Sequence, residues 1–281
     1  ALKGAPENIT EPRFFAYRAS LLLGVGRVDE AGPDLDRALK LNATYSDALA
    51  LQSIIAVVQN DKEKALGIAQ KAVTANPKSA AALTALSYAQ QANFNLDGAR
   101  TSLQQAVQAE PNNALAWARL AEIHLSFANL DDALAAAQKA VALNPNLSRT
   151  QMVLGFAHLV RVNTEDAKKA FEKAIELDQA DALSRLGLGL GKIRDGELVD
   201  GRKELEVAAS LDANNSIVRS YLGKAYYEEK RSDLAERDYA TAKELDPKDP
   251  TPYFYDAIQK QTTNRPVEAL QDMEKAIELN D

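Results

Sequence analysis

Residues 113–145 read NALAWARLAEIHLSFANLDDALAAAQKAVALNP. In the first half of this stretch apolar residues recur every three or four positions, which is the pattern of a half-buried helix. Asn129 and the two aspartates after it suit the start of a second helix with the same period. That helix should end at Asn144, because Pro145 disfavours helical geometry at the residue before it. The stretch therefore predicts a helical hairpin.

The hairpin is one copy of a repeat that runs along the whole chain without insertion or deletion. Eight alanines mark it, each 34 residues after the last: Ala38, Ala72, Ala106, Ala140, Ala174, Ala208, Ala242 and Ala276. A fixed period of this length is the sequence pattern of a solenoid, whose units stack because no unit buries its apolar face alone. Such arrays display long surfaces, so the period favours binding of other molecules over their chemical conversion.

Composition excludes several classes of function. The chain has 281 residues, 46% apolar and 26% charged, with a formal net charge of −7 and no cysteine. An acidic chain repels phosphate backbones, so nucleic acid is not an expected partner. No run approaches the roughly 18 apolar residues of a membrane span. The absence of cysteine removes disulfides and thiolate metal sites but does not decide the compartment.

The repeats resemble the tetratricopeptide repeat family. The fourth copy has Trp117, Leu120, Ala133, Ala140 and Pro145 where the family pattern has tryptophan, leucine, alanine, alanine and proline. The seventh copy is closer still, with Leu222, Gly223, Tyr226, Ala235, Tyr239, Ala242 and Pro247. The resemblance implies an all-α fold, a right-handed α-solenoid superhelix of eight hairpins. We expect a leader at 1–11 and repeats at 12–45, 46–79, 80–113, 114–147, 148–181, 182–215, 216–249 and 250–281.

The sixth repeat is unusual because its first helix contains Gly187, Gly189 and Gly191, and its second contains Gly201. Each interior glycine costs a helix about 1 kcal/mol against alanine. One interpretation is a softer joint that lets repeats one to five move against repeats seven and eight. The alternative is that close helix packing requires Gly189 and that the other glycines arose by drift. The glycines lack the spacing of a phosphate-binding loop and follow no predicted strand, so a nucleotide site is not expected.

Candidate chemistry is sparse. His124 and His158 occupy the same position in adjacent repeats, where the family usually has tyrosine. A metal or acid–base pair is conceivable, but no third ligand shares that face, which favours two tyrosine substitutes inside the hairpins. We therefore predict no catalytic residue, no cofactor and no metal, and no enzyme activity for this segment.

The resemblance also implies a binding surface, because the first helices of tetratricopeptide repeats line the concave face on which peptides lie. The positions of this sequence that match are large and apolar in repeats five and six, with three more elsewhere: Met152, Phe156, Leu159, Leu186, Leu190, Ile193, Tyr88, Ile54 and Phe254. An exposed apolar patch of this kind usually marks an interface. The alternative, that these side chains pack as ordinary core, stays open.

The expected function is a non-catalytic scaffold that binds a protein or peptide partner along this groove. The last hairpin shows Ala269, Leu270, Met273 and Ile277 on its outer face, so we expect further sequence after Asp281 or self-association there. A regulatory, substrate-recruiting arm of a larger enzyme and a self-assembling structural protein are the alternatives. The repeats resemble those of bacterial envelope and export assemblies. That resemblance suggests a bacterial source and a periplasmic or outer-membrane-associated location, with the cytoplasm as the alternative.

Overall fold

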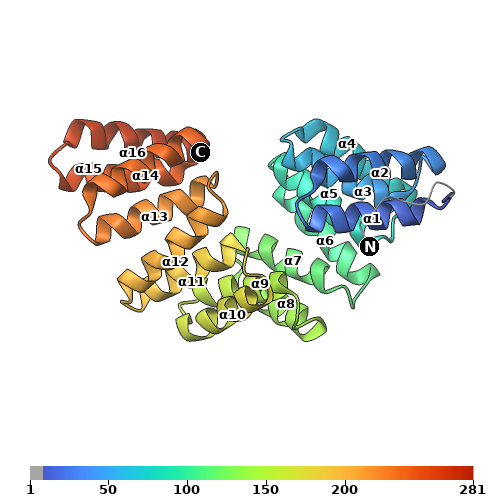
Figure 1. Cartoon of the computed structure of the whole chain (residues 1–281), viewed down its shortest axis with the longest axis horizontal. Helices are drawn as coiled ribbons and strands as arrows, with labels where there is room; N and C mark the ends of the chain where they lie inside the picture. Colours follow the sequence, from blue (N-terminus) through green and yellow to red (C-terminus); the bar gives the residue numbers. More distant parts are fainter. Residues whose placement is uncertain (1–8, 281) are drawn as a thin grey trace. The chain divides into compact units, whose positions relative to one another are not determined.

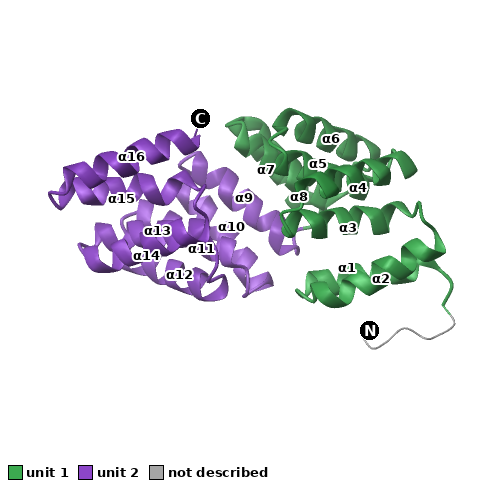
Figure 2. Ribbon diagram, turned by 90° about the horizontal axis from the view of Figure 1, so that it is seen from above, with its two compact units in different colours: residues 1–144 green, residues 145–281 purple. Residues whose placement is uncertain are grey.

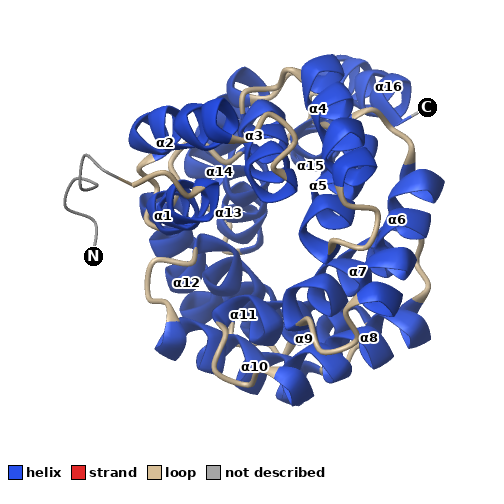
Figure 3. Ribbon diagram, turned by 90° about the vertical axis from the view of Figure 1, so that its right-hand side faces the viewer, coloured by secondary structure: helices blue, strands red, loops and turns tan. Residues whose placement is uncertain are grey.

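The computed structural model describes residues 9–280, and over that range the chain is helical with no strand (Figure 3). Residues 1–8 of the expected leader and Asp281 lie outside the described residues. The helices, in order along the chain (Figure 1), are α1 (Pro12–Gly24), α2 (Val28–Leu41), α3 (Ser46–Val58), α4 (Lys62–Ala75), α5 (Ala80–Ala92), α6 (Leu96–Ala109), α7 (Ala114–Ser126), α8 (Leu130–Leu143), α9 (Ser148–Val160), α10 (Thr164–Leu177), α11 (Ala182–Arg194), α12 (Leu198–Leu211), α13 (Ser216–Glu228), α14 (Ser232–Leu245), α15 (Pro250–Thr262) and α16 (Pro266–Asn280).

The helices form hairpins, and the hairpins fall into two compact units (Figure 2). Unit 1 is residues 1–144 and contains α1 to α8; unit 2 is residues 145–281 and contains α9 to α16. Within each unit the two helices of a hairpin pack on one another, and the second helix of a hairpin packs on the first helix of the next. The all-α fold of stacked hairpins is therefore confirmed. No helix in the described range is both long and apolar enough to cross a membrane.

The periodic small residues lie where helices approach closely. Ala38, Ala72, Ala106 and Ala140 of unit 1 are fully buried, as are Ala174, Ala208 and Ala242 of unit 2. In the sixth repeat two glycines face each other across the hairpin. A Cβ atom on Gly201 would lie 2.6 Å from the carbonyl oxygen of Gly189, and one on Gly189 would lie 2.8 Å from that of Gly201. The two backbones therefore touch, and a side chain at either position would push them apart.

A buried phenylalanine explains a third glycine of the sixth repeat. The ring of Phe171 on α10 is fully buried between Gly155 on α9 and Gly187 on α11. A Cβ atom on Gly155 would lie 2.6 Å from Cε1 of this ring, and one on Gly187 would overlap its Cζ. Phe156 meets the same ring edge-on, with centroids 4.9 Å apart. Close packing therefore accounts for Gly189, which favours the packing alternative over the softer joint. It also accounts for Gly187 and Gly201, so the expectation that the other glycines arose by drift is wrong for these two.

The turns between the paired helices share one backbone feature that the sequence pattern did not reveal. The residue at the same place in each turn has a positive φ, and successive ones are 34 residues apart: Gly26, Asn60, Phe94, Ala128, Val162, Gly196, Lys230 and Asn264. A left-handed residue after a helix end lets its own N–H and that of the next residue donate hydrogen bonds to the last carbonyl groups of the helix. Glycine adopts this geometry freely, whereas β-branched residues such as Val162 are strained in it.

Replacing Val162 with glycine should stabilise unit 2. Val162 has φ 62° and is 66% exposed, so it contributes strain at the turn and little packing. Left-handed geometry costs an L-residue about 1–2 kcal/mol, and glycine removes this cost. Glycine also makes the unfolded chain more flexible, which cancels part of the gain in stability. We expect a gain of about 1 kcal/mol in the free energy of unfolding, measured by urea denaturation. The reverse change Gly196→Val, at φ 88° in the next turn, should destabilise; similar midpoints for both variants would contradict this account.

The last two hairpins are joined by a cluster of four charges on α14, α15 and α16. Lys243 Nζ lies 2.7 Å from Asp256 Oδ2 and 2.8 Å from Asp272 Oδ1. Lys260 Nζ lies 3.0 Å from Asp256 Oδ2 and 2.6 Å from Asp272 Oδ2. Burial alone would raise the pKa of Asp272, but the hydrogen bonds from the two lysines outweigh it and lower that pKa. Asp272 therefore stays ionised at neutral pH, and the four ion pairs hold α16 against α14 and α15.

Candidate partner-binding groove

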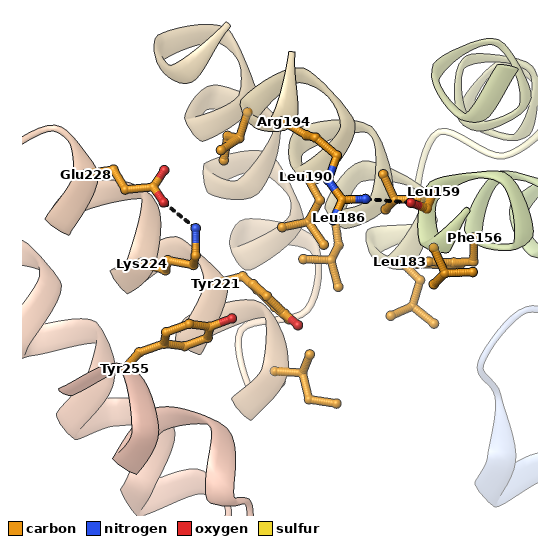
Figure 4. A pocket seen from close by; sticks show the side chains of 13 residues that line it. Phe156, Leu159, Leu183, Leu186, Leu190, Arg194, Tyr221, Lys224, Glu228 and Tyr255 are labelled. Carbon is orange, nitrogen blue, oxygen red and sulfur yellow. Dashed lines mark hydrogen bonds and ion pairs between the residues drawn. The ribbon is translucent and has the colours of Figure 1, made fainter. Parts of the chain in front are cut away.

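Unit 2 contains an open groove of about 720 Å³ formed by its four first helices (Figure 4). We call it the unit 2 groove. Each of the helices α9, α11, α13 and α15 contacts the next, so their inward side chains make one continuous surface. The residues that line the groove are Phe156, Leu159, Val160, Leu183, Leu186, Leu190, Ile193, Arg194, Ile217, Tyr221, Lys224, Glu228 and Tyr255.

The floor of the groove belongs to the core, and its rim is exposed. Leu186 is 3% exposed and Leu159 is 7% exposed, because each also packs between helices. The rim carries three apolar residues that are exposed to water over close to half of their surface: Val160 at 44%, Leu183 at 40% and Ile217 at 48%. Such a cluster of exposed apolar side chains around a concave surface is unfavourable in water and is typical of an interface.

The structure places the nine groove residues expected from the sequence in several different environments. Phe156, Leu159, Leu186, Leu190 and Ile193 all line the unit 2 groove. Met152 is not among the residues that line this groove, and its side chain is buried at 9% exposure, as the core alternative expects.

The other three expected residues do not line the unit 2 groove. The ring of Tyr88 in unit 1 is covered by the guanidinium of Arg119, whose Cζ is 3.9 Å from the ring centroid. Ile54 lines a smaller hollow of about 430 Å³ in unit 1. Phe254 is 44% exposed and lines a hollow of about 450 Å³ against α16.

Sequence reasoning missed Leu183, Ile217, Tyr221 and Tyr255. A signal for them existed, because Leu183 and Ile217 are 34 residues apart, as are Tyr221 and Tyr255. The first pair is the second residue of α11 and α13, and the second pair is the sixth residue of α13 and α15. Large side chains repeated at one position of successive first helices therefore predict the lining better than apolar character within one helix.

The two tyrosines form one end of the groove. Their ring centroids are 5.8 Å apart with planes inclined by 58°. Burial, together with the neighbouring Tyr221, raises the pKa of Tyr255 to about 12. Its hydroxyl therefore keeps its proton at neutral pH and is able to donate a hydrogen bond as well as accept one.

Charged side chains line the groove near the C-terminal ends of α11 and α13. Arg194 at the end of α11 is exposed, and its Nη1 donates a hydrogen bond to the carbonyl oxygen of Leu159 at 2.7 Å (Figure 4). Lys224 on α13 is paired with Glu228 one turn later. The lining thus has two cations and one anion, in a chain whose formal net charge is −7.

Comparison with known proteins gives the family. Tetratricopeptide repeat models match three regions, at residues 18–80, at 90–155, and at 163–181 with 222–249, which together exceed half of the chain. The chain belongs to the tetratricopeptide repeat family. A search of curated proteins returned no significant match.

Solved structures with the same fold are distant in sequence. A chain of the APC/C hetero-tetramer Cut9-Hcn1 is 18% identical, with a TM-score of 0.81 over 94% of this chain and 52% of that one. A tetratricopeptide repeat protein from Parabacteroides merdae is 19% identical, with a TM-score of 0.63 over 84% and 94% of the two chains. PilF of Pseudomonas aeruginosa is 21% identical, with a TM-score of 0.57 over 72% and 92%. The chain spans about half of the length of the Cut9-Hcn1 chain, and at these identities the likeness establishes the fold alone.

The two histidines of the tetratricopeptide repeats lie in different units. In unit 1 burial lowers the pKa of His124, whose Nδ1 is 4.0 Å from Asp132 Oδ2. In unit 2 burial likewise lowers the pKa of His158, whose Nδ1 is 3.3 Å from the side-chain nitrogen of Asn163. Residues 9–280 contain no group of three or more side chains of the metal-binding types placed to hold an ion. Each imidazole is thus favoured in its neutral form within its own hairpin.

The outer face of the last tetratricopeptide repeat is exposed in part. Leu270 is 59% exposed and Ile277 is 58% exposed, as the sequence indicated. Ala269 is only 5% exposed, so its assignment to the outer face is wrong. Tyr221 and Tyr255 line both the unit 2 groove and the hollow that contains Met273 and Ile277, so the apolar surface continues from the groove to α16.

Proposed function

We propose that this chain is a non-catalytic scaffold that binds a segment of a partner protein in the unit 2 groove. The tetratricopeptide repeat fold is consistent with a protein-interaction scaffold. The observation that supports the finer proposal is the exposed apolar rim of Val160, Leu183 and Ile217 above a floor that the core already fixes. A rigid floor lowers the entropy lost on binding, and the rim supplies apolar area that a partner would remove from water.

A display selection with a random peptide library on the wild-type chain tests the proposal. Selected peptides are then titrated against Leu183→Asp, Ile217→Asp and Leu115→Asp. These three residues share one position in their first helices and are all exposed, so each variant should fold. Leu115 lies in unit 1 and serves as the matched control.

We expect the two unit 2 variants to weaken binding by about tenfold or more, because each buries a charge beneath the bound segment. The Leu115→Asp variant should bind like the wild type. If the selected peptides bind all three variants equally, or if Leu115→Asp alone loses them, the unit 2 groove is not the binding site.

A location in the bacterial envelope stays a further proposal that is supported by resemblance of the repeats alone. Self-association through Leu270 and Ile277 likewise stays an alternative use of the exposed face of α16. Measurement of mass by light scattering, on the wild type and on the Leu270→Asp variant, distinguishes a self-assembling chain from a monomeric scaffold.

A further inference from the structure

We propose that the unit 2 groove takes an extended, polyproline II-type segment that has an apolar residue at every third position and a carboxylate that pairs with Arg194. The inference rests on the proposed function and adds the conformation and the chemistry of the bound segment. Three features of the groove carry it: the spacing of its helices, its tyrosine pair and its unpaired arginine.

The usual spacing of packed helices is close to the polyproline II period. Packed helices lie about 8–10 Å apart, and α9, α11, α13 and α15 contact one another in succession. A polyproline II segment rises about 9 Å over each turn of three residues. Side chains on one face of such a segment therefore meet one helix each. In a β-strand, same-face side chains are about 6.6 Å apart and would fall out of step with the helices.

The length of the segment follows from the same spacing. Three intervals of about 9 Å separate four packed helices. At about 3.1 Å per residue, an extended segment of about nine residues crosses them.

The tyrosine pair suits the exposed backbone of an extended segment. Polyproline II has no internal hydrogen bonds, so its carbonyl groups must find donors elsewhere. The Tyr221 and Tyr255 rings lie 5.8 Å apart at the end of the groove, and the Tyr255 hydroxyl keeps its proton at neutral pH. Grooves lined by aromatic rings are the usual surface for segments of this conformation.

Of the two cations that line the groove, Arg194 is the one without a carboxylate partner among the described residues. Across residues 9–280, Arg194 has no acidic side chain within ion-pair distance, and its guanidinium makes a single hydrogen bond, to the carbonyl of Leu159. Lys224, by contrast, already has Glu228. A guanidinium has five N–H donors in a planar fork that matches a carboxylate. An acidic residue of the segment near α9 and α11 would complete this site.

Fluorescence anisotropy with designed peptides of about ten residues tests the inference. The probe has leucine at every third position, proline between the leucines and aspartate at one end; a second probe has the aspartate at the other end, since direction is open. Three control peptides are compared with the probes. In the first, asparagine replaces the aspartate. The second, the out-of-step peptide, has the same composition with leucine at every second position, and the third is a helical heptad peptide. Each is titrated with the wild type, Arg194→Gln, Ile217→Asp and the control Lys169→Gln. The side chain of Lys169 is 70% exposed on α10 and does not line the groove.

We expect one of the two aspartate probes to bind the wild type, and the asparagine and out-of-step peptides to bind about tenfold more weakly. Arg194→Gln should weaken the aspartate probe and leave the asparagine peptide unchanged, whereas Lys169→Gln should change neither. The inference is wrong if no aspartate probe binds, or if the out-of-step peptide binds as tightly as the better aspartate probe. It is also wrong if the helical peptide binds the wild type more tightly than that probe does and binds the Ile217→Asp variant more weakly. The last result would leave the proposed function intact, while a groove that binds neither these probes nor any library peptide would overturn both.

Discussion

Replacing Gly187 with alanine is expected to lower the free energy of unfolding of unit 2 by about 3 kcal/mol. The added Cβ atom would overlap the ring of Phe171, which is fully buried. The ring has no room to retreat, because Gly155 closes its other side, where a Cβ atom would lie 2.6 Å from it. The helices α10 and α11 would therefore have to separate. Chemical denaturation monitored by circular dichroism measures the effect.

Two comparisons separate this clash from a general effect of alanine. Gly67 lies inside α4 of unit 1, and a Cβ atom added to it would have no neighbouring atom within 4 Å, so Gly67→Ala should stabilise by about 0.5–1 kcal/mol. In a Phe171→Leu background the smaller side chain leaves space, and Gly187→Ala should cost about 1 kcal/mol or less. If Gly187→Ala is as stable as the wild type, then α11 does not pack on Phe171 as described.

Replacing Asp256 with alanine is expected to be the second large effect, a loss of about 3 kcal/mol. The Asp256 side chain is only 5% exposed and contacts both Lys243 and Lys260. Its removal leaves two largely buried ammonium groups to share Asp272 alone. Because neighbouring repeats stabilise one another, the loss should be concentrated in α15 and α16. Amide hydrogen exchange should therefore become faster in these two helices, while protection in α9 to α12 stays close to that of the wild type.

Glu278→Ala is the matched control for Asp256→Ala. Glu278 pairs with Lys275 on the same terminal helix, but the Glu278 side chain is 70% exposed, and exposed pairs contribute about 0.5 kcal/mol or less. If both variants have the same exchange rates in α15 and α16, the buried cluster does not hold the last hairpin in place.

The sequence was sufficient for the fold because its period repeats without interruption. Every first helix begins at a fixed distance from the previous one, and the periodic alanines are buried as the pattern indicated. The groove was harder to predict, because a position that points inward can still be covered by the next helix. Met152 and Phe254 occupy the same position in their helices, yet Met152 is 9% exposed and Phe254, on the last first helix described, is 44% exposed. The exposure of a side chain thus depends on the neighbouring helices that cover it, and the period of the sequence does not show which positions are covered.

The glycines of the sixth repeat show a second limit. Helix propensity considers only the helix stability that is lost when glycine stands in place of alanine, and it therefore suggested a soft joint at the sixth repeat. What decides the role of Gly187 is the ring of Phe171, which is 16 residues away in the sequence and meets Gly187 only after the hairpins stack. The turn conformation of Val162 was also beyond the sequence pattern, because a valine gives no sign of a positive φ.

Methyl-selective NMR of the chain with a library-selected peptide tests the central claim most directly. If the unit 2 groove binds the segment, the methyl signals of Leu183, Leu190, Ile193 and Ile217 should shift on titration, while those of Ile54 and Leu115 in unit 1 should not. Saturable shifts confined to unit 1, or no shift at any of the four groove residues, would contradict the account.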